Sequence, residues 1–209
     1  MGKGSVWETR LGISGRFLRV LGWLVANTVQ RPKLCGPKVR LDEPTIFAIR
    51  HVGLMDPLML MAKYPGKVLH PLAAVDYFEK NAFTRWFYKS AQCIPIDRKN
   101  GSQEWLDLSM KALAKGESVI IAPEGRRNKS GKGVLPFRWG VSILAEKSGA
   151  RVVPVWNEMW KFPHRYRLAM GEPIYLGSMP EGCSREDWLH VQTARIQDAV
   201  EALEKRAKA

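Results

Sequence analysis

Short apolar runs alternate with longer amphipathic segments over most of this chain. The runs have the length and β-branched content of strands and lie at 44–50, 67–75, 91–96, 117–123, 150–157 and 165–174. Helical patterns lie at 57–64, 76–90, 102–116 and 136–149, and a final helix is expected to begin at 184–187. Because strands that alternate with helices build a sheet covered by helices, the pattern predicts a layered α/β fold.

The expected helices are bounded by residues that favour helix ends. Gly116 and Gly149 each follow a helical segment, and Pro136 opens one of them. Ser184 begins a Ser-Arg-Glu-Asp sequence, which has the form of a capping box at a helix start. With 209 residues, the chain is long enough for one α/β domain with a substantial core.

The chain is strongly basic, with a formal net charge of +13. A charge of this size implies an anionic partner, which is a nucleic acid, an acidic membrane surface or a phosphorylated substrate. The three cysteines, Cys35, Cys93 and Cys183, lie far apart and form no Cys-x-x-Cys pair. This spacing fits a reducing compartment and argues against a zinc site or a disulfide framework.

The positive charge is concentrated in the first 40 residues. They contain one acidic residue, Glu8, and these basic residues: Lys3, Arg10, Arg16, Arg19, Arg31, Lys33, Lys38 and Arg40. The same region contains an apolar, tryptophan-bearing segment at 16–30, whose uncharged run covers 20–30. That run is too short to span a bilayer, which needs about 20 residues. No small-x-small cleavage site follows convincingly, so a signal peptide is not expected.

A basic apolar helix of this kind can lie in the membrane interface. Burial of its apolar side chains and attraction of its cations to anionic lipid favour reversible binding. The alternative is a helix that packs on the core of its own domain. We predict that residues 1–40 form a basic amphipathic membrane-associating helical segment and that residues 41–209 form one catalytic domain.

The stretch "RHVGLMDP", residues 50–57, contains the first candidate for chemistry. On a regular helix, residues five positions apart are rotated by about 140°, so His51 and Asp56 would not meet. A turn from a strand into a helix would bring them together, with Gly53 at the bend and Asp56-Pro57 as helix cap and first helical residue. The carboxylate would then orient the imidazole, whose other nitrogen acts as a base. The alternative is that Asp56 only caps a helix and His51 only ends a strand.

A second candidate lies in "IAPEGRRNKSGKG", residues 121–133. An apolar strand leads into Glu124 and Gly125, and glycine lets a backbone approach a ligand closely. Arg126 and Arg127 offer forked guanidinium donors that suit phosphate. The spacing is not that of a Walker A loop, and the alternative is a solvated basic loop.

A third candidate follows the expected strand at 91–96. Asp97 and Arg98 come directly after it, which places a guanidinium at the carboxyl end of a strand. Ligands of α/β folds bind at that end of the sheet. By itself, this arginine is a weak indication of a site.

Taken in order, the motifs are more specific than any one of them. His-x4-Asp is followed by Ile-Asp-Arg at 96–98, by Pro-Glu-Gly-x-Arg at 123–127 and by Val-Val-Pro-Val at 152–155. Over about residues 41–176 the chain resembles the glycerolipid acyltransferases, which include 1-acylglycerol-3-phosphate acyltransferases and related lysophospholipid acyltransferases. The resemblance implies a mixed, largely parallel sheet flanked by helices, and makes residues 41–209 an acyltransferase catalytic domain.

The resemblance also implies roles for individual residues. His51 would be the general base that takes the proton of an acceptor hydroxyl, and Asp56 would orient it. The substrate-binding residues would be Arg98, Glu124, Gly125, Arg126, Arg127 and Pro154. Of these, Arg127 falls on the arginine of the third motif, and Pro154 would shape the acyl or donor site. No metal and no cofactor is implied, and the acyl donor is acyl-CoA or acyl carrier protein.

The sequence departs from the family pattern around the expected acceptor site. The family usually has asparagine before the histidine, where this chain has Arg50. The third motif usually reads Glu-Gly-Thr-Arg-Ser, and here Arg126 and Asn128 stand in the threonine and serine places. These differences concern the identity of the acceptor more than the type of reaction.

The function expected from these features is acyl transfer to the free hydroxyl of a lysophospholipid, with 1-acylglycerol-3-phosphate giving phosphatidic acid as the leading case. Alternatives are a different lysolipid acceptor, an acyl thioesterase, and a non-enzymatic basic module that binds membrane or nucleic acid. Nucleic acid is disfavoured because aromatic residues do not alternate with the basic loops. We expect the protein on an anionic membrane surface, peripheral on the cytoplasmic face of the bacterial inner membrane.

Overall fold

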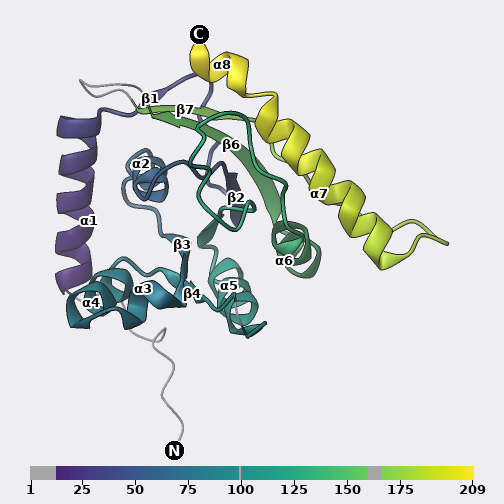
Figure 1. Cartoon of the computed structure of the whole chain (residues 1–209), viewed down its shortest axis with the longest axis horizontal. Helices are drawn as coiled ribbons and strands as arrows, with labels where there is room; N and C mark the ends of the chain where they lie inside the picture. The colour runs from purple at the N-terminus through teal and green to yellow at the C-terminus, as the bar shows by residue number, and fades with distance from the viewer. Residues whose placement is uncertain (1–12, 99, 160–165) are drawn as a thin grey trace, which may run out of the picture.

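A computed structural model of the chain describes residues 13–98, 100–159 and 166–209. Residues 1–12, which belong to the predicted membrane-associating segment, lie outside the described residues. A seven-stranded sheet forms the centre of the molecule, and helices lie on both of its faces (Figure 1). The predicted mixed, largely parallel α/β fold is confirmed.

Strands from across the chain build the sheet in the order β1-β7-β6-β2-β5-β3-β4. Their bounds are β1 Lys33–Leu34, β2 Thr45–Ile49, β3 Leu69–Ala74, β4 Ile94–Ile96, β5 Ser118–Ile121, β6 Arg151–Met159 and β7 Tyr166–Met170. Strands β2 to β6 run parallel, whereas β7 is antiparallel to β6 and parallel to β1. Each predicted strand is present, and β1 is an addition of two residues that is too short for a pattern to reveal.

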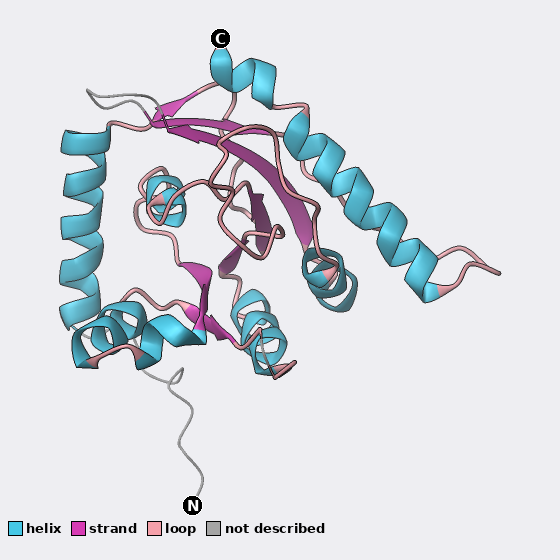
Figure 2. Cartoon of the chain, in the orientation of Figure 1, coloured by secondary structure: helices cyan, strands magenta, loops and turns pink. Residues whose placement is uncertain are grey.

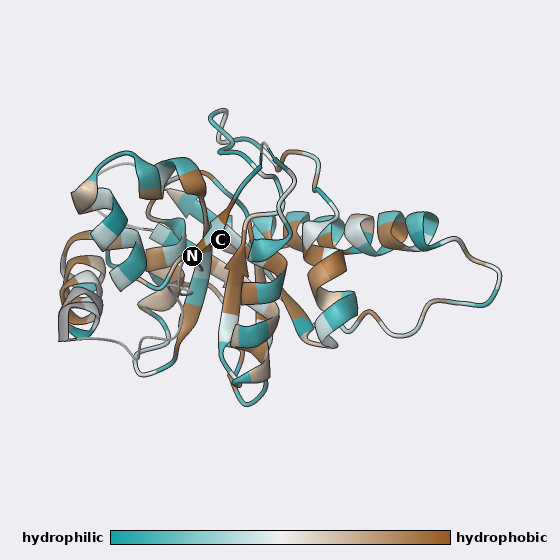
Figure 3. Ribbon diagram, turned by 90° about the horizontal axis from the view of Figure 1, so that it is seen from below, coloured by the Kyte–Doolittle hydropathy of each residue, from teal (hydrophilic) through white to brown (hydrophobic). Residues whose placement is uncertain are grey.

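The central strands are buried on both faces because helices cover both sides of the sheet. Every residue of β2 and β5 is buried, as are the first seven residues of β6. A parallel strand in this position is continuously apolar rather than alternating, which explains the uninterrupted runs in the sequence. Figure 3 shows hydrophobic stretches on the central strands and mixed hydropathy along the outer helices.

Each face of the sheet has its own apolar core. Side chains such as Ile46, Val152 and Trp156 pack on one face against α5 Glu104–Ala114, α6 Gly140–Ser148, α7 Arg185–Glu201 and α8 Glu204–Lys208. Side chains such as Phe47 and Val153 pack on the other against α2 Asp56–Met61 and the short π-helix η1 Ala26–Gln30. Figure 2 shows the resulting arrangement of helices on both sides of the strands.

Two expected helices differ from the pattern in instructive ways. The segment 76–90 forms α3 Val75–Glu79 and α4 Ala82–Ser90, because the Asn81 side chain caps α4 by accepting the Thr84 N–H at 2.8 Å. Helix α6 begins at Gly140 rather than at Pro136, and the N–H groups of Phe137 and Arg138, which precede it, bond to other parts of the chain. They donate to Gln197 Oε1 and to Pro123 O, each at 2.9 Å.

The segment that carries the predicted interfacial helix forms α1 Ile13–Val25, which continues into η1. Helix α1 contacts α2 and α4 (Figure 1). A small pocket of about 230 Å³ is lined by residues of α1 and α2. No helix within residues 13–98, 100–159 and 166–209 combines the length and the apolar character needed to cross a bilayer.

Candidate active site

The carboxyl ends of the parallel strands gather the predicted site residues at one edge of the sheet. His51 follows β2, Glu124 follows β5 and Arg98 follows β4. Strands β2 and β5 are paired neighbours, so the segments that follow them leave the sheet side by side. The structure therefore brings together residues that are 26 to 73 positions apart in the sequence, at the edge where α/β folds bind their ligands.

His51 and Asp56 are in contact. His51 Nδ1 lies 2.9 Å from Asp56 Oδ2, across the turn that joins β2 to α2. The aspartate side chain is fully buried, whereas 24% of the imidazole side chain is exposed. With Nδ1–H donated to the carboxylate, the lone pair of Nε2 is available to accept a proton from a substrate. The predicted pairing of these two side chains is therefore present.

Asp56 does not cap its own helix, which corrects the expected role of Asp56-Pro57. Helix α2 is preceded by Met55, and no side chain caps it. The Asp56 carboxylate turns back instead, and Oδ2 accepts the N–H groups of Val52 and Gly53 at 2.8 Å each. Oδ1 accepts a hydrogen bond from the Tyr166 hydroxyl. Four donors thus fix a buried carboxylate that holds the imidazole.

Gly53 is needed at the turn for space rather than for a left-handed backbone. A Cβ at this position would lie 2.9 Å from Met159 Sδ and 3.4 Å from Asp56 Oδ1. Its φ angle is not among the positive values found at other glycines of the chain. The glycine therefore allows the end of β6 to approach the turn that contains His51 and Asp56.

Glu124 ties the His51 turn to the loop that follows β5. Its Oε1 accepts the His51 N–H at 2.7 Å, and its Oε2 accepts the Leu135 N–H at 3.0 Å. The side chain is 2% exposed. Burial raises the pKa of its carboxyl group, although these two bonds and the charge of Arg50 act in the opposite direction. Both carboxylate oxygens accept backbone N–H groups. Glu124 therefore joins two segments of the site and does not face a ligand.

Asn128 shapes the loop that carries Arg126 and Arg127. Its N–H donates to His51 O at 2.6 Å, and its side-chain amide donates to Lys132 O at 3.0 Å. The side chain is buried, whereas both arginines are exposed. Neither guanidinium forms an ion pair with a described residue. Their charges are therefore available to an anion beside the His51 turn.

Gly125 is the point where two further arginines approach the same loop. The Arg98 guanidinium donates to Gly125 O, and a Cβ on Gly125 would lie 2.9 Å from Arg138 Nε. Gly125 also has a positive φ of 67°, which disfavours any side chain there. Arg98 and Arg138 therefore contact the residue that directly follows Glu124, whose side chain holds the His51 turn.

Pro154 is the predicted site residue that the structure does not bring to this cluster. It lies inside β6, opposite Ala48 of β2, and is buried. Its carbonyl accepts the Gly171 N–H at 2.9 Å, and a Cβ on Gly171 would lie 2.7 Å from its Cγ. Its contacts are with the sheet, so any influence on a substrate has to pass through the position of β6.

Metal chemistry has no candidate site in the described part of the chain. Within those residues, no group of three or more histidine, cysteine, aspartate or glutamate side chains could hold a metal ion. The chemical resources of the site are therefore one imidazole, a buried carboxylate that orients it, and several guanidinium groups around the adjoining loop. This combination suits proton abstraction from a hydroxyl next to an anionic group.

Comparison with known proteins places these residues in a family. The family model described as Acyltransferase matches residues 25–158, which include the His51 turn, Arg98 and the Glu124 loop. The chain belongs to the acyltransferase family. The family resemblance predicted from the order of the motifs is thereby confirmed.

Individual relatives of this chain are distant. It is 28% identical over 116 residues to the 1-acyl-sn-glycerol-3-phosphate acyltransferase of Helicobacter pylori, which covers 53% of this chain and 46% of that protein. A chloroplastic protein of the same name from Arabidopsis thaliana is 28% identical, over 54% of this chain and 32% of its own. The N-acylphosphatidylethanolamine synthase of Arabidopsis thaliana is 26% identical, and the match covers 50% of this chain and 40% of that protein. The chain spans less than half the length of each of these relatives.

A solved structure shares the fold. The crystal structure of the 1-acyl-sn-glycerophosphate acyltransferase PlsC from Thermotoga maritima matches with a TM-score of 0.63 and 21% identity. The match covers 91% of this chain and 79% of that protein. The likeness extends beyond the residues of the family model to most of the chain.

Arg50, where the family usually has asparagine, is a buried structural residue. It is 1% exposed, and its guanidinium donates to Gly133 O at 2.6 Å, to Asn157 O at 2.9 Å and to Gly131 O. The group also stacks on Trp156, 4.1 Å from the ring centroid. Burial lowers its pKa, against the opposing charges of Glu158 and Glu124. Arg50 therefore clamps the 131–133 loop to β6 and does not face a ligand.

Sequence reasoning missed several residues that complete the site. Tyr166 bonds to Asp56, and Leu135 supplies an N–H to Glu124, but nothing in the local pattern indicates either contact. Asn128 gave a usable indication, because an Asn-Lys-Ser-Gly sequence favours an Asx turn. Arg138 was hidden inside a segment expected to be helical.

Proposed function

We propose that this protein transfers a fatty acyl chain from a thioester to the free hydroxyl of a lysophospholipid, with 1-acylglycerol-3-phosphate as the preferred acceptor. The observation that carries the proposal is the contact between His51 Nδ1 and the buried Asp56 carboxylate at 2.9 Å. The names of the relatives in Helicobacter pylori and Arabidopsis thaliana support the choice of acceptor.

The reaction needs one base and no covalent enzyme intermediate. His51 Nε2 takes the proton of the acceptor hydroxyl as its oxygen attacks the thioester carbonyl carbon. The carbon–sulfur bond then breaks, an ester bond remains, and the imidazolium returns its proton to the departing thiolate. Asp56 stabilises the imidazolium in between, and a base positioned in this way contributes on the order of 10²–10⁴-fold.

The guanidinium groups around the loop give the acceptor's phosphate a place to bind. Arg126 and Arg127 are exposed on the loop that bonds to the His51 turn, and the Arg98 guanidinium donates to Gly125 O of the same loop. Guanidinium groups form charge-assisted hydrogen bonds with phosphate oxygens, each worth about 1.5–3 kcal/mol. Glu124 and Gly125 serve in this proposal by shaping the loop, because Glu124 bonds to backbone groups and Gly125 is in close contact with Arg138.

A membrane surface would deliver the lipid acceptor to this site. Large apolar side chains are exposed on α1, on α4 and on the His51 turn, namely Phe17, Val20, Leu21, Trp23, Leu24, Phe83, Trp86, Phe87, Leu54 and Met55. Helices α1 and α4 are in contact, and α1 also contacts α2, which follows the turn. We propose that α1, α4 and this turn form one face that docks on an anionic membrane, with the enzyme peripheral on the cytoplasmic side.

The proposal is tested by assaying purified protein with palmitoyl-CoA and a panel of lysolipids, with product identification by mass. His51→Ala and Asp56→Asn should each lower kcat by about 10²-fold or more while the thermal unfolding transition remains. Arg127→Gln should mainly raise the KM for lysophosphatidic acid. Near-normal turnover by His51→Ala would remove the proposed base.

The same assay separates the remaining acceptors. One relative is named N-acylphosphatidylethanolamine synthase, so phosphatidylethanolamine, which carries a free amine, is included in the panel. A mass gain on that lipid, with none on lysophosphatidic acid, would assign a different acceptor and leave His51 as the proposed base. Release of free fatty acid with every acceptor would identify a thioesterase.

A further inference from the structure

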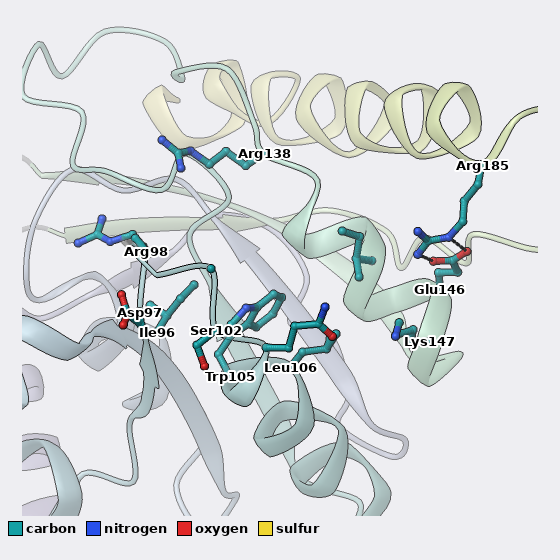
Figure 4. A pocket seen from close by; sticks show the side chains of 13 residues that line it. Ile96, Asp97, Arg98, Ser102, Trp105, Leu106, Arg138, Glu146, Lys147 and Arg185 are labelled. Carbon is teal, nitrogen blue, oxygen red and sulfur yellow. Dashed lines mark hydrogen bonds and ion pairs between the residues drawn. The ribbon is translucent and has the colours of Figure 1, made fainter.

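A pocket of about 800 Å³ lies next to the candidate active site, between the end of β4, α5 and α6. None of the residues of the His51 turn lines it. Its volume lies within the range of roughly 300–1,000 Å³ that is typical of small-molecule sites. Figure 4 shows Arg98 and Arg138 at one end of the pocket, Lys147 at the other, and the indole of Trp105 between them.

Two of the cations that line the pocket form no ion pair with a described residue. Arg185 also lines it, but its guanidinium is paired with Glu146, with Nε at 3.0 Å from Oε1. Arg138 and Lys147 are both exposed, and neither forms an ion pair with a described residue. Two uncompensated cations at opposite ends of one pocket favour a ligand with separate anionic groups.

The space between these cations is bounded by a flat aromatic surface. Trp105 is half-buried, and the start of α6 supports its ring, because a Cβ on Gly140 would lie 3.6 Å from Cη2. Indole rings offer a stacking surface for heteroaromatic bases. The lining therefore matches a ligand that has a heteroaromatic ring between two phosphorylated positions.

The pocket is connected to the catalytic turn by the loop after β5. Arg98 donates to Gly125 O, and Arg138 lies against Gly125. The preceding residue, Glu124, accepts the His51 N–H at 2.7 Å. A ligand with one anionic group at Arg138 would therefore lie against the loop whose Glu124 side chain holds the His51 turn.

We propose that this pocket binds the phosphorylated adenosine end of a coenzyme A thioester, so that acyl-CoA is the donor. The inference rests on the proposed function for the identity of the reaction. Adenine would stack on Trp105, the pyrophosphate would bind Arg138, and the 3′-phosphate would bind Lys147. The phosphopantetheine arm of a carrier protein has no adenine and would leave Trp105 and Lys147 without a partner.

Binding is measured first, because it requires no catalytic activity. Isothermal titration of the full chain with adenosine 3′,5′-bisphosphate should give a Kd that rises about 10-fold in Arg138→Gln, Lys147→Gln and Trp105→Leu. Lys111→Gln, on the exposed face of α5 outside the pocket, is the matched control and should bind like the wild type. Lys147 is a surface residue, so its variant decides the test even if Trp105→Leu does not fold.

Kinetics then distinguish the donor from the acceptor as the source of the phosphate. In Lys147→Gln, the KM for palmitoyl-CoA should rise about 10-fold, with no change for palmitoyl-pantetheine or lysophosphatidic acid. A raised KM for lysophosphatidic acid instead would assign the pocket to the acceptor. Absence of nucleotide binding by the wild type would overturn the inference whether or not acyl transfer occurs, whereas binding without transfer would overturn only the proposed function.

Discussion

At the scale of single residues, the site depends on buried charged groups that are fully hydrogen-bonded. The Asp56 carboxylate accepts four hydrogen bonds, and the Arg50 guanidinium donates three. A buried charge is tolerated only with partners of this kind, because desolvation otherwise costs several kcal/mol. Replacement of these groups should therefore lower the free energy of unfolding more than replacement of exposed residues.

Replacement of Arg50 by methionine should destabilise the fold by about 3 kcal/mol, since it removes three donors and leaves backbone carbonyls of the 131–133 loop and β6 without partners. The free energy of unfolding in urea measures the effect. Arg126→Met is the control, because Arg126 is exposed and forms no ion pair with a described residue. Equal stability of the two variants would contradict the structural role of Arg50.

Glu124→Gln should change how stability depends on pH. Because burial raises the pKa of Glu124 in the folded protein, the folded state holds the proton more tightly than the unfolded state. The stabilisation of wild type relative to Glu124→Gln should be fully present below the ordinary carboxyl pKa of 4.5 and decline as the pH rises through the raised value. Urea unfolding of both proteins at pH 4 and pH 7 measures this difference, and a difference that grows toward pH 7 would contradict it.

At the scale of single elements, α4 has its large apolar side chains exposed. None of its residues is buried, and Phe83, Trp86 and Phe87 are exposed on one side at spacings of three and four residues. The Asn81 cap separates it from α3, which sets the direction of that apolar side. Exposure of three large aromatic side chains on one helix is consistent with contact to lipid.

Replacement of Phe83 and Trp86 by serine should weaken binding to anionic vesicles by about 10-fold or more, at roughly 1 kcal/mol for each half-buried ring. Flotation with vesicles measures the bound fraction. Val191→Ser is the control, since Val191 is 59% exposed on α7, on the other side of the sheet from α1 and α2. Loss of binding by the control alone would place the membrane contact elsewhere.

At the scale of the whole molecule, the net charge of +13 and the exposed apolar face act on the same partner by different forces. Attraction of basic residues to anionic lipid contributes about 1 kcal/mol for each residue near the surface and acts only within a Debye length. Burial of aromatic side chains is largely independent of salt. The two contributions can therefore be separated by ionic strength.

Raising the salt concentration from 0.1 M to 1 M should weaken vesicle binding strongly without abolishing it, because the Debye length falls from about 10 Å to about 3 Å. Co-sedimentation with vesicles that contain phosphatidylglycerol measures the change, and vesicles of neutral phosphatidylcholine provide the comparison. Binding that is equal for both lipids at low salt would show that the positive charge serves another partner.

Local patterns in the sequence predicted the strands and most of the helices, because apolar periodicity and capping depend on residues close together in the chain. They also identified His51, Asp56 and the arginines as the groups that could do chemistry. Only the tertiary structure decided that Asp56 bonds to Tyr166 instead of capping α2, that Arg50 and Glu124 are internal clamps, and that a basic pocket opens beside Trp105. Those contacts join residues far apart in sequence, and the order of strands in the sheet, which no local pattern specifies, sets which of them meet.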